Sequence, residues 1–359
     1  MPGSATEAAA RAAFARQAEW AEKLESPFMA RLCRVIGKRL DRGTEAGRRV
    51  LGWPGTADSF ADAVPLRLTG GLHALVRSGE SPELAGCYPP NPIPDEDRLW
   101  TALRPVLDSP DLLPWLDGAP QTNEVGRSAV LMSGLLVVAD LFPQPVELLE
   151  LGASAGLNLA LDRYGYDLGG VRAGDPASPL QLRPDWQGLP PPDAPVRVAS
   201  RRGVDLHPLD PRRDGGRLLA YVWPDQAERL QRLETALALA SEDPRPVERG
   251  DAADWIEARV AEPQESGRTR VVLHSIAFQY FPDEACARIV AALEEAGAAA
   301  TFARPLAWLR YEHDAGDDRV TLRLRAWPSG EERLLAHCHP HGSAVEWLWG
   351  AAPLTENGL

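Results

Sequence analysis

Apolar residues recur with a helical period through the first third of the chain. They are spaced every three or four positions within residues 6–25 and again within residues 27–40. A third apolar stretch, residues 66–76, has the same spacing, although two adjacent glycines weaken the prediction of a helix there. No alternation typical of a β-strand appears before Val146. The pattern therefore predicts an N-terminal all-helical domain over residues 1–118.

The pattern changes at the polar run QTNE, residues 121–124, which predicts a helix start with Thr122 or Asn123 as its cap. The strongly apolar residues 129–142 continue that helix. Short apolar runs then alternate with helical stretches. Strands are expected at residues 146–150, 196–199, 247–249, 270–276 and 306–312, and helices at residues 224–240, 253–260 and 282–296. Residues 320–326 and 333–338 have the pattern of a closing hairpin.

Strands that alternate with helices are typical of an open, largely parallel sheet, and a terminal hairpin adds an antiparallel edge. We therefore expect an α/β fold of the Rossmann-like type for residues 119–359, preceded by the all-helical domain. Residues 164–195 are rich in glycine and proline and interrupt the alternation, so they are predicted to be an insertion.

Composition and charge narrow the classes of partner. The 359 residues carry a formal net charge of −13, and 44% of them are hydrophobic. A phosphate-binding surface needs clustered positive charge, so no nucleic-acid partner is expected. No apolar run is long enough for a membrane span, and the start of the chain lacks the apolar core of a signal peptide. The four cysteines form no C-x-x-C pair. These features predict a cytoplasmic protein with no membrane contact.

A glycine-rich turn in the stretch VELLELGASAGLNL, residues 146–159, fits two unrelated chemistries. Gly152, Ser154 and Gly156 match the G-x-S-x-G elbow that presents a nucleophilic serine in α/β-hydrolases. The same turn, taken together with the preceding Glu150, also fits a cofactor site. In such a site an acidic residue is followed by small residues that begin a helix and let a nucleotide-like cofactor approach the end of a strand. The elbow requires strands before the serine, and none is expected. This favours the cofactor interpretation, with Ser154 as a small residue that hydrogen-bonds the ligand.

Acidic residues stand at three expected strand ends, Glu150, Asp205 and Asp251. Ligands of open α/β sheets bind beyond the carboxyl ends of the strands, and charged side chains are seldom buried without a partner. With an adenosine-bearing cofactor, Glu150 would accept hydrogen bonds at the turn, including one from a methionine amino group. Asp205 would accept from the ribose hydroxyls, and Asp251, beside Ala252, from the adenine amino group.

This order of motifs resembles class I S-adenosylmethionine-dependent methyltransferases, in which an acid and a glycine turn are followed by further acids after the second and third strands. Asp205 lies further from the turn than is usual, which requires an insertion between them. The resemblance implies a methyltransferase-type sheet in which Arg127 clamps the cofactor's carboxylate, with a surface salt bridge or a helix cap as the alternative. The implied cofactor-binding residues are Gln121, Arg127, Glu150, Gly152, Ser154, Gly156, Asn158, Asp205, Asp251 and Ala252.

Most of the chain is also similar to an uncharacterised bacterial family catalogued as a domain of unknown function, number two-three-three-two. The similarity rests on QTNEVGRSA (121–129), LELGASAGLNL (149–159), DRYGY (162–166), RRGVDLHPLD (201–210), YVWPDQAERLQRL (221–233) and HPHG (339–342). That family carries a methyltransferase-like label at best. The similarity therefore supports the fold more than it supports any reaction.

Candidate catalytic residues follow the fourth strand and the closing hairpin. His274 and Tyr280 stand where methyl acceptors bind in such folds, and His274 would act as a general base. The alternative for His274 is a hydrogen-bonded residue at a strand end. Alternate histidines within residues 337–341 suggest a metal site, but Pro340 interrupts them and no acidic or cysteine partner has ligand spacing. We therefore expect no metal, and interpret His341 as lining the acceptor site.

Together these features predict an S-adenosylmethionine-dependent methyltransferase that acts on an unidentified small molecule. The acceptor is expected to enter between the two domains. Two alternatives stay open. One is a serine hydrolase that uses Ser154 with, for instance, Asp251 and His341; the other is a non-catalytic cofactor-binding module.

Overall fold

The computed structural model divides the chain into two compact units. The described residues are 2–59, 61–243, 247–314 and 319–350. The first unit comprises residues 1–122 and 214–234, and the second comprises residues 123–213 and 235–359. Residues 214–234, which stand within the sheet-forming part of the sequence, therefore pack with the N-terminal helices.

The described part of the first unit contains helices and loops but no strand, and the helices expected from the apolar spacing are present. Its elements are α1 (Pro2–Lys23), α2 (Pro27–Arg39), α3 (Glu45–Leu51), α4 (Val64–Arg77), α5 (Pro82–Ala85), α6 (Glu96–Leu103), the 3₁₀ helix η1 (Arg104–Asp108) and α7 (Pro114–Asp117). Parts of α9 (Pro211–Tyr221) and α10 (Ala227–Glu242) complete it. Apolar side chains from these helices form one buried core.

Helix α4 runs through the glycine pair that weakened its prediction. A Cβ on Gly70 would stand 2.6 Å from Cε1 of Tyr221, and a Cβ on Gly71 would stand 2.7 Å from Cδ1 of Leu112. Glycine costs a helix roughly 1 kcal/mol relative to alanine. Here the missing side chains let two large neighbours pack against the helix backbone, and that close packing offsets the cost.

Residues 214–234 are tied to the N-terminal helices by a cap on α2. The carboxylate of Asp225 accepts a hydrogen bond of 2.8 Å from the backbone N–H of Phe28 and another from Oγ of Ser26. Free N–H groups at a helix start need an acceptor, which is usually a side chain directly before the helix. Here the acceptor lies almost two hundred residues away in the sequence, so no local pattern could have shown it.

The second unit is built on one nine-stranded sheet, whose order is β5-β12-β11-β10-β9-β8-β1-β6-β7. Its strands are β1 (Val146–Leu151), β5 (Asp185–Gln187), β6 (Val198–Asp205), β7 (Val247–Arg249), β8 (Thr269–Ser275), β9 (Leu306–His313), β10 (Val320–Trp327), β11 (Glu331–Cys338) and β12 (Ala344–Trp347). Five neighbouring strands, in the order β7, β6, β1, β8 and β9, form a parallel block. Strands β9, β10, β11 and β12 then form an antiparallel meander. The expected α/β fold with an antiparallel edge is confirmed.

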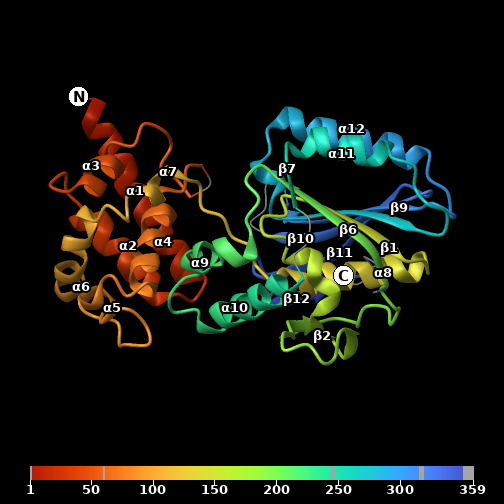
Figure 1. The fold of residues 1–359 in the computed structure, drawn as a ribbon, viewed down its shortest axis with the longest axis horizontal. Coiled ribbons are helices and arrows are strands. Elements are labelled where there is room, and N and C mark those ends of the chain that lie inside the picture. Colours follow the sequence, from red (N-terminus) through yellow and green to blue (C-terminus); the bar gives the residue numbers. More distant parts are fainter. Residues whose placement is uncertain (1, 60, 244–246, 315–318, 351–359) are drawn as a thin grey trace, which may run out of the picture. The chain divides into compact units, whose positions relative to one another are not determined.

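The parallel block has the strand order of a doubly wound sheet. Numbered by their sequence order within the block, its strands run 3-2-1-4-5. Figure 1 shows α11 (Ala252–Ala261) and α12 (Asp283–Ala298) on one face of the sheet and α8 (Arg127–Leu141) on the other. Helix α8 is apolar around most of its circumference and almost wholly buried. The point where the strand order reverses lies between β1 and β8.

The crossover from β1 to β6 contains the predicted insertion. A 3₁₀ helix, η2 (Asn158–Arg163), follows the glycine turn and leads to a small separate sheet. That sheet is made of β2 (Gly165–Leu168), β3 (Val171–Gly174) and β4 (Gln181–Leu182). The chain then adds β5 to the outer edge of the large sheet, parallel to β12.

Two predicted helix starts were wrong. Helix α8 begins at Arg127 after Gly126, not at Thr122 or Asn123, because the side chain of Asn123 instead accepts a hydrogen bond of 3.1 Å from the backbone N–H of Leu157. The helix expected at residues 224–240 begins at Ala227. Helix α9 and the short strands β5 and β12 were not predicted, since glycines break the first pattern and the strands are too short to alternate clearly.

Candidate functional site

Polar side chains gather at the carboxyl ends of the five parallel strands. Glu150 is the second-to-last residue of β1, Asp205 ends β6, Asp251 follows β7, His274 is in β8 and Glu312 is in β9. In sheets of this order the crevice at the reversal point, here between β1 and β8, is the usual place for a ligand. The sheet therefore brings together residues that are spread over more than 160 positions of the sequence.

The glycine turn after β1 has a backbone path that needs glycine. Gly152 and Gly156 both have φ of +71°, in the left-handed region that glycine adopts without strain. The N–H groups of Gly152 and Ala153 donate to the carbonyl of Val204 at 2.9 and 3.0 Å, which fixes the turn on β6. A Cβ on Gly152 would stand 2.7 Å from Cβ of Ala277. Glycine is thus required at position 152 for two independent reasons.

Ser154 occupies the centre of this turn with φ of +52°, a strained value for a residue with a side chain. Its N–H donates to Oδ2 of Asp205 at 2.9 Å. Its hydroxyl oxygen is buried and has no hydrogen-bond partner among the described residues. A nucleophilic serine needs a base within hydrogen-bond reach. The turn resembles an elbow in its backbone, but no histidine of the described chain activates the serine.

Glu150 is the most unusual group of the site. It is 1% exposed, and Oε1 accepts a hydrogen bond of 3.2 Å from Nδ2 of Asn158, while Oε2 has no partner in the described structure. Burial raises its pKa to about 8, the nearby charge of Asp205 adds to the rise, and the bond from Asn158 opposes it. A carboxyl group that is buried with one idle oxygen is costly, and such groups concentrate at functional sites.

Asn158 links the glycine turn to α8. Its Oδ1 accepts a hydrogen bond of 2.8 Å from the hydroxyl of Ser128 while its Nδ2 serves Glu150. Asn123, on the chain before α8, holds the neighbouring N–H of Leu157. Asn123 and Ser128 were not among the predicted site residues. Both stand in the QTNEVGRSA stretch, and the signal for Ser128 was a polar residue at the start of a strongly apolar helix.

Asp205 ends β6 and lies against the glycine turn. One carboxylate oxygen accepts from Ser154 N–H, and the other accepts from the N–H of His207 at 2.8 Å. Asp205 both shapes the turn and places negative charge beside Glu150.

Asp251 caps a helix. Its Oδ1 accepts from the N–H groups of Ala253 and Asp254 at 2.8 and 3.1 Å, and Ala252 is the first residue of α11. Asp before an apolar helical stretch is the ordinary signature of a cap. The contacts therefore give Asp251 a structural role that is independent of any ligand.

His274 is fully buried with both ring nitrogens engaged. The indole N–H of Trp308 donates to Nε2 at 3.1 Å, so Nε2 is an acceptor and carries no proton. Nδ1 therefore carries the proton and donates to Oε1 of Glu312 at 2.6 Å. Neither nitrogen is left to receive a proton from a substrate. The contacts favour the alternative of a hydrogen-bonded strand-end residue for His274.

Glu312 was not among the predicted site residues, although the strand-end rule that selected the other acids applies to it. Besides His274, its Oε1 accepts from the N–H groups of Ala277 and Phe278 at 3.0 and 3.2 Å, and its Oε2 has no partner in the described structure. Burial alone would raise its pKa, but these donors outweigh burial and hold the pKa below the ordinary value. The bonds fix a loop in which Ile276 has φ of +48°, a rare value for a β-branched residue.

A model of the family described as "Uncharacterized protein conserved in bacteria (DUF2332)" matches residues 11–347. The chain belongs to this family. No curated protein and no solved structure matches the chain. Family membership confirms the likeness drawn from the sequence motifs. The family description names no reaction, so the likeness to methyltransferases stays a prediction.

In this DUF2332 member, Arg127 joins the end of β8 to the HPHG turn, residues 339–342. Its Nη1 donates to the carbonyl of Ser275 at 2.7 Å and its Nε donates to that of Pro340 at 3.0 Å. His341 lies in that turn, and its backbone N–H donates to Nδ1 of His339 at 3.2 Å. The HPHG turn is thereby attached to the start of α8 and to the end of β8.

Tyr280 and Gln121 are the remaining predicted site residues. Tyr280 ends the 3₁₀ helix η3 (Phe278–Tyr280) after β8, and it is 63% exposed. Gln121 belongs to the first unit.

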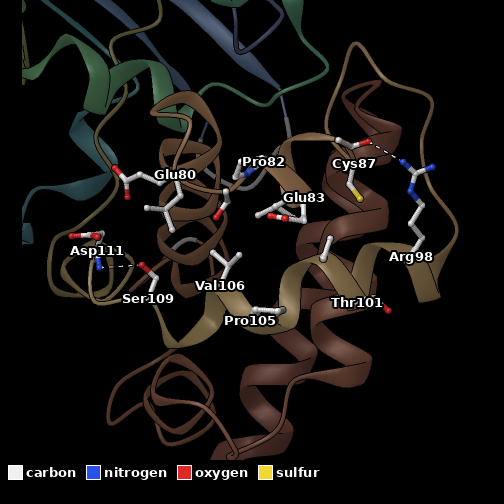
Figure 2. Close-up of a pocket in the computed structure, with 15 residues that line it drawn as sticks. Glu80, Pro82, Glu83, Cys87, Arg98, Thr101, Pro105, Val106, Ser109 and Asp111 are labelled. Atoms are coloured by element: carbon white, nitrogen blue, oxygen red, sulfur yellow. Dashed lines mark hydrogen bonds between the residues drawn. The ribbon is translucent and has the colours of Figure 1, made fainter.

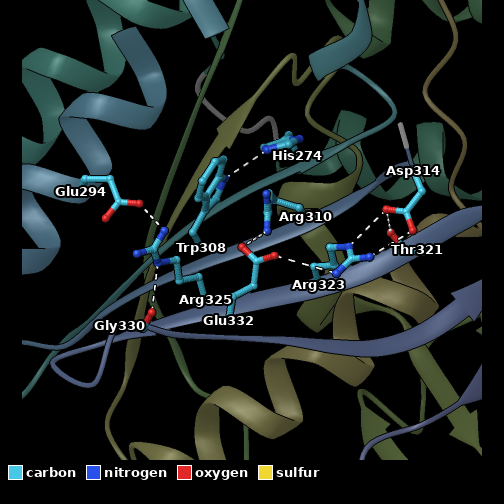
Figure 3. Close-up of polar contacts among 10 residues, drawn as sticks. All are labelled: His274, Glu294, Trp308, Arg310, Asp314, Thr321, Arg323, Arg325, Gly330 and Glu332. Carbon is cyan, nitrogen blue, oxygen red and sulfur yellow. Dashed lines mark hydrogen bonds and ion pairs between the residues drawn. The ribbon is translucent and has the colours of Figure 1, made fainter. Parts of the chain in front are cut away.

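Beyond Trp308, a row of ion pairs crosses the antiparallel part of the sheet (Figure 3). Arg310 pairs with Glu332, and Nη2 of Arg323 donates to Oδ2 of Asp314 at 3.0 Å. The guanidinium of Arg310 also lies 4.4 Å from the ring centre of Trp308. These ion pairs give the row a structural role in joining β9, β10 and β11.

In the described part of the chain, no three His, Cys, Asp or Glu side chains are grouped closely enough to hold a metal ion. Among the same residues, no helix has the length and apolar character that crossing a membrane requires.

Proposed function

We propose that the protein is an S-adenosylmethionine-dependent methyltransferase of a small molecule, with its cofactor at the carboxyl ends of β1, β6 and β8. The observation that carries the proposal is Glu150, which is buried at the end of the first parallel strand with one oxygen unpartnered. A cation is the ligand that a buried carboxylate favours most. S-adenosylmethionine bears a sulfonium and an ammonium group, and it carries no phosphate.

The composition of the turn supports a cofactor without phosphate over a dinucleotide. A dinucleotide site uses G-x-G-x-x-G and places the pyrophosphate at the N-terminus of a long helix. This turn has its glycines four positions apart, at 152 and 156, and leads into a six-residue 3₁₀ helix. Asp205 flanks it with negative charge that would repel a phosphate. These features favour an uncharged or cationic group at the turn.

Residues already present fit the parts of such a cofactor. Glu150 Oε2 and the Ser154 hydroxyl are buried polar atoms with unused hydrogen-bonding capacity, and native structures rarely leave such atoms idle. Glu150 would hold the ammonium group, and Asp205 would accept from the ribose hydroxyls. Asn158 would keep Glu150 oriented through its existing bond. Asp251 contributes by capping α11.

The bound cofactor would supply an electrophilic methyl group. What the chain must add is the position of the acceptor and, for a protonated acceptor, a group that takes its proton. His274 has no free nitrogen for that task, because Trp308 and Glu312 occupy both. Tyr280 and His341 stay the predicted acceptor-site residues. The Glu312–His274 pair would serve by fixing the loop that carries Tyr280.

Calorimetry with the full chain tests the proposal. We expect wild type to bind S-adenosylmethionine and S-adenosylhomocysteine, and not to bind NAD. Glu150→Gln and Asp205→Asn should weaken binding at least about tenfold, because each removes a charge-assisted contact. Glu295→Gln removes an exposed carboxylate from α12 and should bind as wild type. Failure of wild type to bind S-adenosylmethionine would overturn the proposal.

Two further measurements separate the alternatives. Transfer of a labelled methyl group to any of a panel of amines, alcohols, thiols and carboxylates would support catalysis, whereas binding without transfer would favour a cofactor-binding module. The left-handed conformation of Ser154 keeps the serine hydrolase as the second candidate. Labelling of wild type by a fluorophosphonate, lost in Ser154→Ala, would support the hydrolase and count against the cofactor site.

A further inference from the structure

The first unit contains a groove that is separate from the strand-end site. It has a volume of about 1210 Å³ and lies between the chain around α5, residues 80–87, and the chain from α6 through η1, residues 98–111. Pockets for small organic ligands typically have volumes of roughly 300–1,000 Å³. The groove is therefore large enough for a ligand of that class with room to spare.

The inner wall of the groove is apolar. Leu75, Leu84 and Cys87 line it while being 4%, 0% and 1% exposed, so they belong to the packed core of the unit and present only a small part of their surface. Ala102 and Val106 line the α6–η1 side and are half-buried. A wall of this kind binds the hydrocarbon part of a ligand through the hydrophobic effect.

The rim of the groove is acidic. Glu80, Glu83 and Asp111 line it and are exposed, and none of their carboxylates forms an ion pair with a described residue (Figure 2). Elsewhere in the unit arginines pair with carboxylates repeatedly, as Arg49 does with Asp117. The one basic side chain of the groove, Arg98, donates to the carbonyl of Gly86 at 3.3 Å. The rim therefore has an excess of uncompensated negative charge.

We propose that this groove binds a small organic cation with an apolar body, such as an alkylammonium compound. The apolar wall accepts the hydrocarbon part, and the carboxylates of Glu80, Glu83 and Asp111 attract the cationic head. Neither feature suffices by itself, since exposed acids are common on protein surfaces and an apolar wall has no preference for charge. Their combination in one concavity selects a ligand that carries both properties.

The test uses the full chain and three probes of equal chain length: octyltrimethylammonium, octanoate and octyl glucoside, each below its micelle concentration and measured by calorimetry. The groove variant is Glu80→Gln with Glu83→Gln and Asp111→Asn. The matched control is Glu19→Gln with Glu25→Gln and Glu228→Gln, which removes the same number of exposed charges from elsewhere in the same unit. Val106→Trp fills the groove without changing charge.

We expect octyltrimethylammonium to bind wild type in preference to octanoate and octyl glucoside. The groove variant should weaken its binding about tenfold, since three exposed charge contacts of ordinary strength together change affinity by roughly that factor. The control variant should bind as wild type, and Val106→Trp should abolish binding. The proposal is overturned by absence of binding, by equal binding of octanoate, or by equal loss in the control variant. Unchanged binding in Val106→Trp would also overturn it, because the cation would then bind elsewhere.

Discussion

The second unit should become much less stable as the pH rises, and replacing Glu150 with glutamine should abolish this decrease. The folded unit holds the pKa of Glu150 near about 8, against 4.5 for the free side chain, because the carboxyl is buried. Between these two values the folded state binds the proton and the unfolded state does not. Stability is therefore fully present below the unfolded pKa and is lost as the pH rises through the folded pKa.

The size of the effect follows from the shift. Each pKa unit corresponds to about 1.36 kcal/mol, so a shift from 4.5 to about 8 amounts to roughly 5 kcal/mol between acidic and alkaline solution. That is a large part of the total stability of an ordinary domain, which is about 5–15 kcal/mol. Glutamine has nearly the same shape, it keeps an oxygen for the bond from Asn158, and it does not ionise. The variant should lose this pH dependence while keeping the turn.

Hydrogen exchange of the β1 and β8 amides, corrected for intrinsic rates, measures the opening free energy of this unit from about pH 5 to about pH 9. The difference between wild type and Glu150→Gln isolates the one carboxyl from all other titrating groups. Glu295→Gln, on the exposed surface of α12, controls for the change in net charge. Parallel profiles of wild type and Glu150→Gln over this range would refute the argument, because they would mean that Glu150 is solvated in the folded protein.

Three other perturbations test separate parts of the structure. Burial lowers the pKa of His73 to about 4 from 6.5, so the first unit should lose about 3 kcal/mol as the pH falls between those values, and urea unfolding of His73→Gln should lack that loss. Gly152→Ala should lower the free energy of unfolding by about 2–4 kcal/mol in thermal unfolding, because its φ is left-handed and the new Cβ would contact Ala277. Gly170→Ala should lower it by only about 1 kcal/mol, because Gly170 has φ of +99° but open space around it. Asp251→Ala should destabilise α11 by about 1 kcal/mol, whereas Asp251→Asn should not, because asparagine also caps helices. If the stable asparagine variant lost S-adenosylmethionine binding, the carboxylate of Asp251 would have a second role.

Much of the second unit could be predicted because its signals are local. Short runs rich in valine and leucine predict buried parallel strands, and β1 (VELLEL) and β8 (TRVVLHS) have such runs. The glycines of the turn were found in the same way, since a left-handed backbone is a property of one residue and its neighbours. The placement of Glu150 and Asp205 at one edge followed from the rule that carboxyl ends of parallel strands meet.

The sequence by itself determined which residues arrive at the strand ends, because local periodicity and chain direction fix where a strand stops. Only the tertiary structure decided what each of them does there. Trp308 and Glu312 come from a strand more than thirty residues beyond His274, and together they set its tautomer and leave it no free nitrogen. Burial in the folded unit gives Glu150 its raised pKa. Ionisation and hydrogen-bond partners depend on every group packed around a side chain, and that environment exists only after the chain has folded.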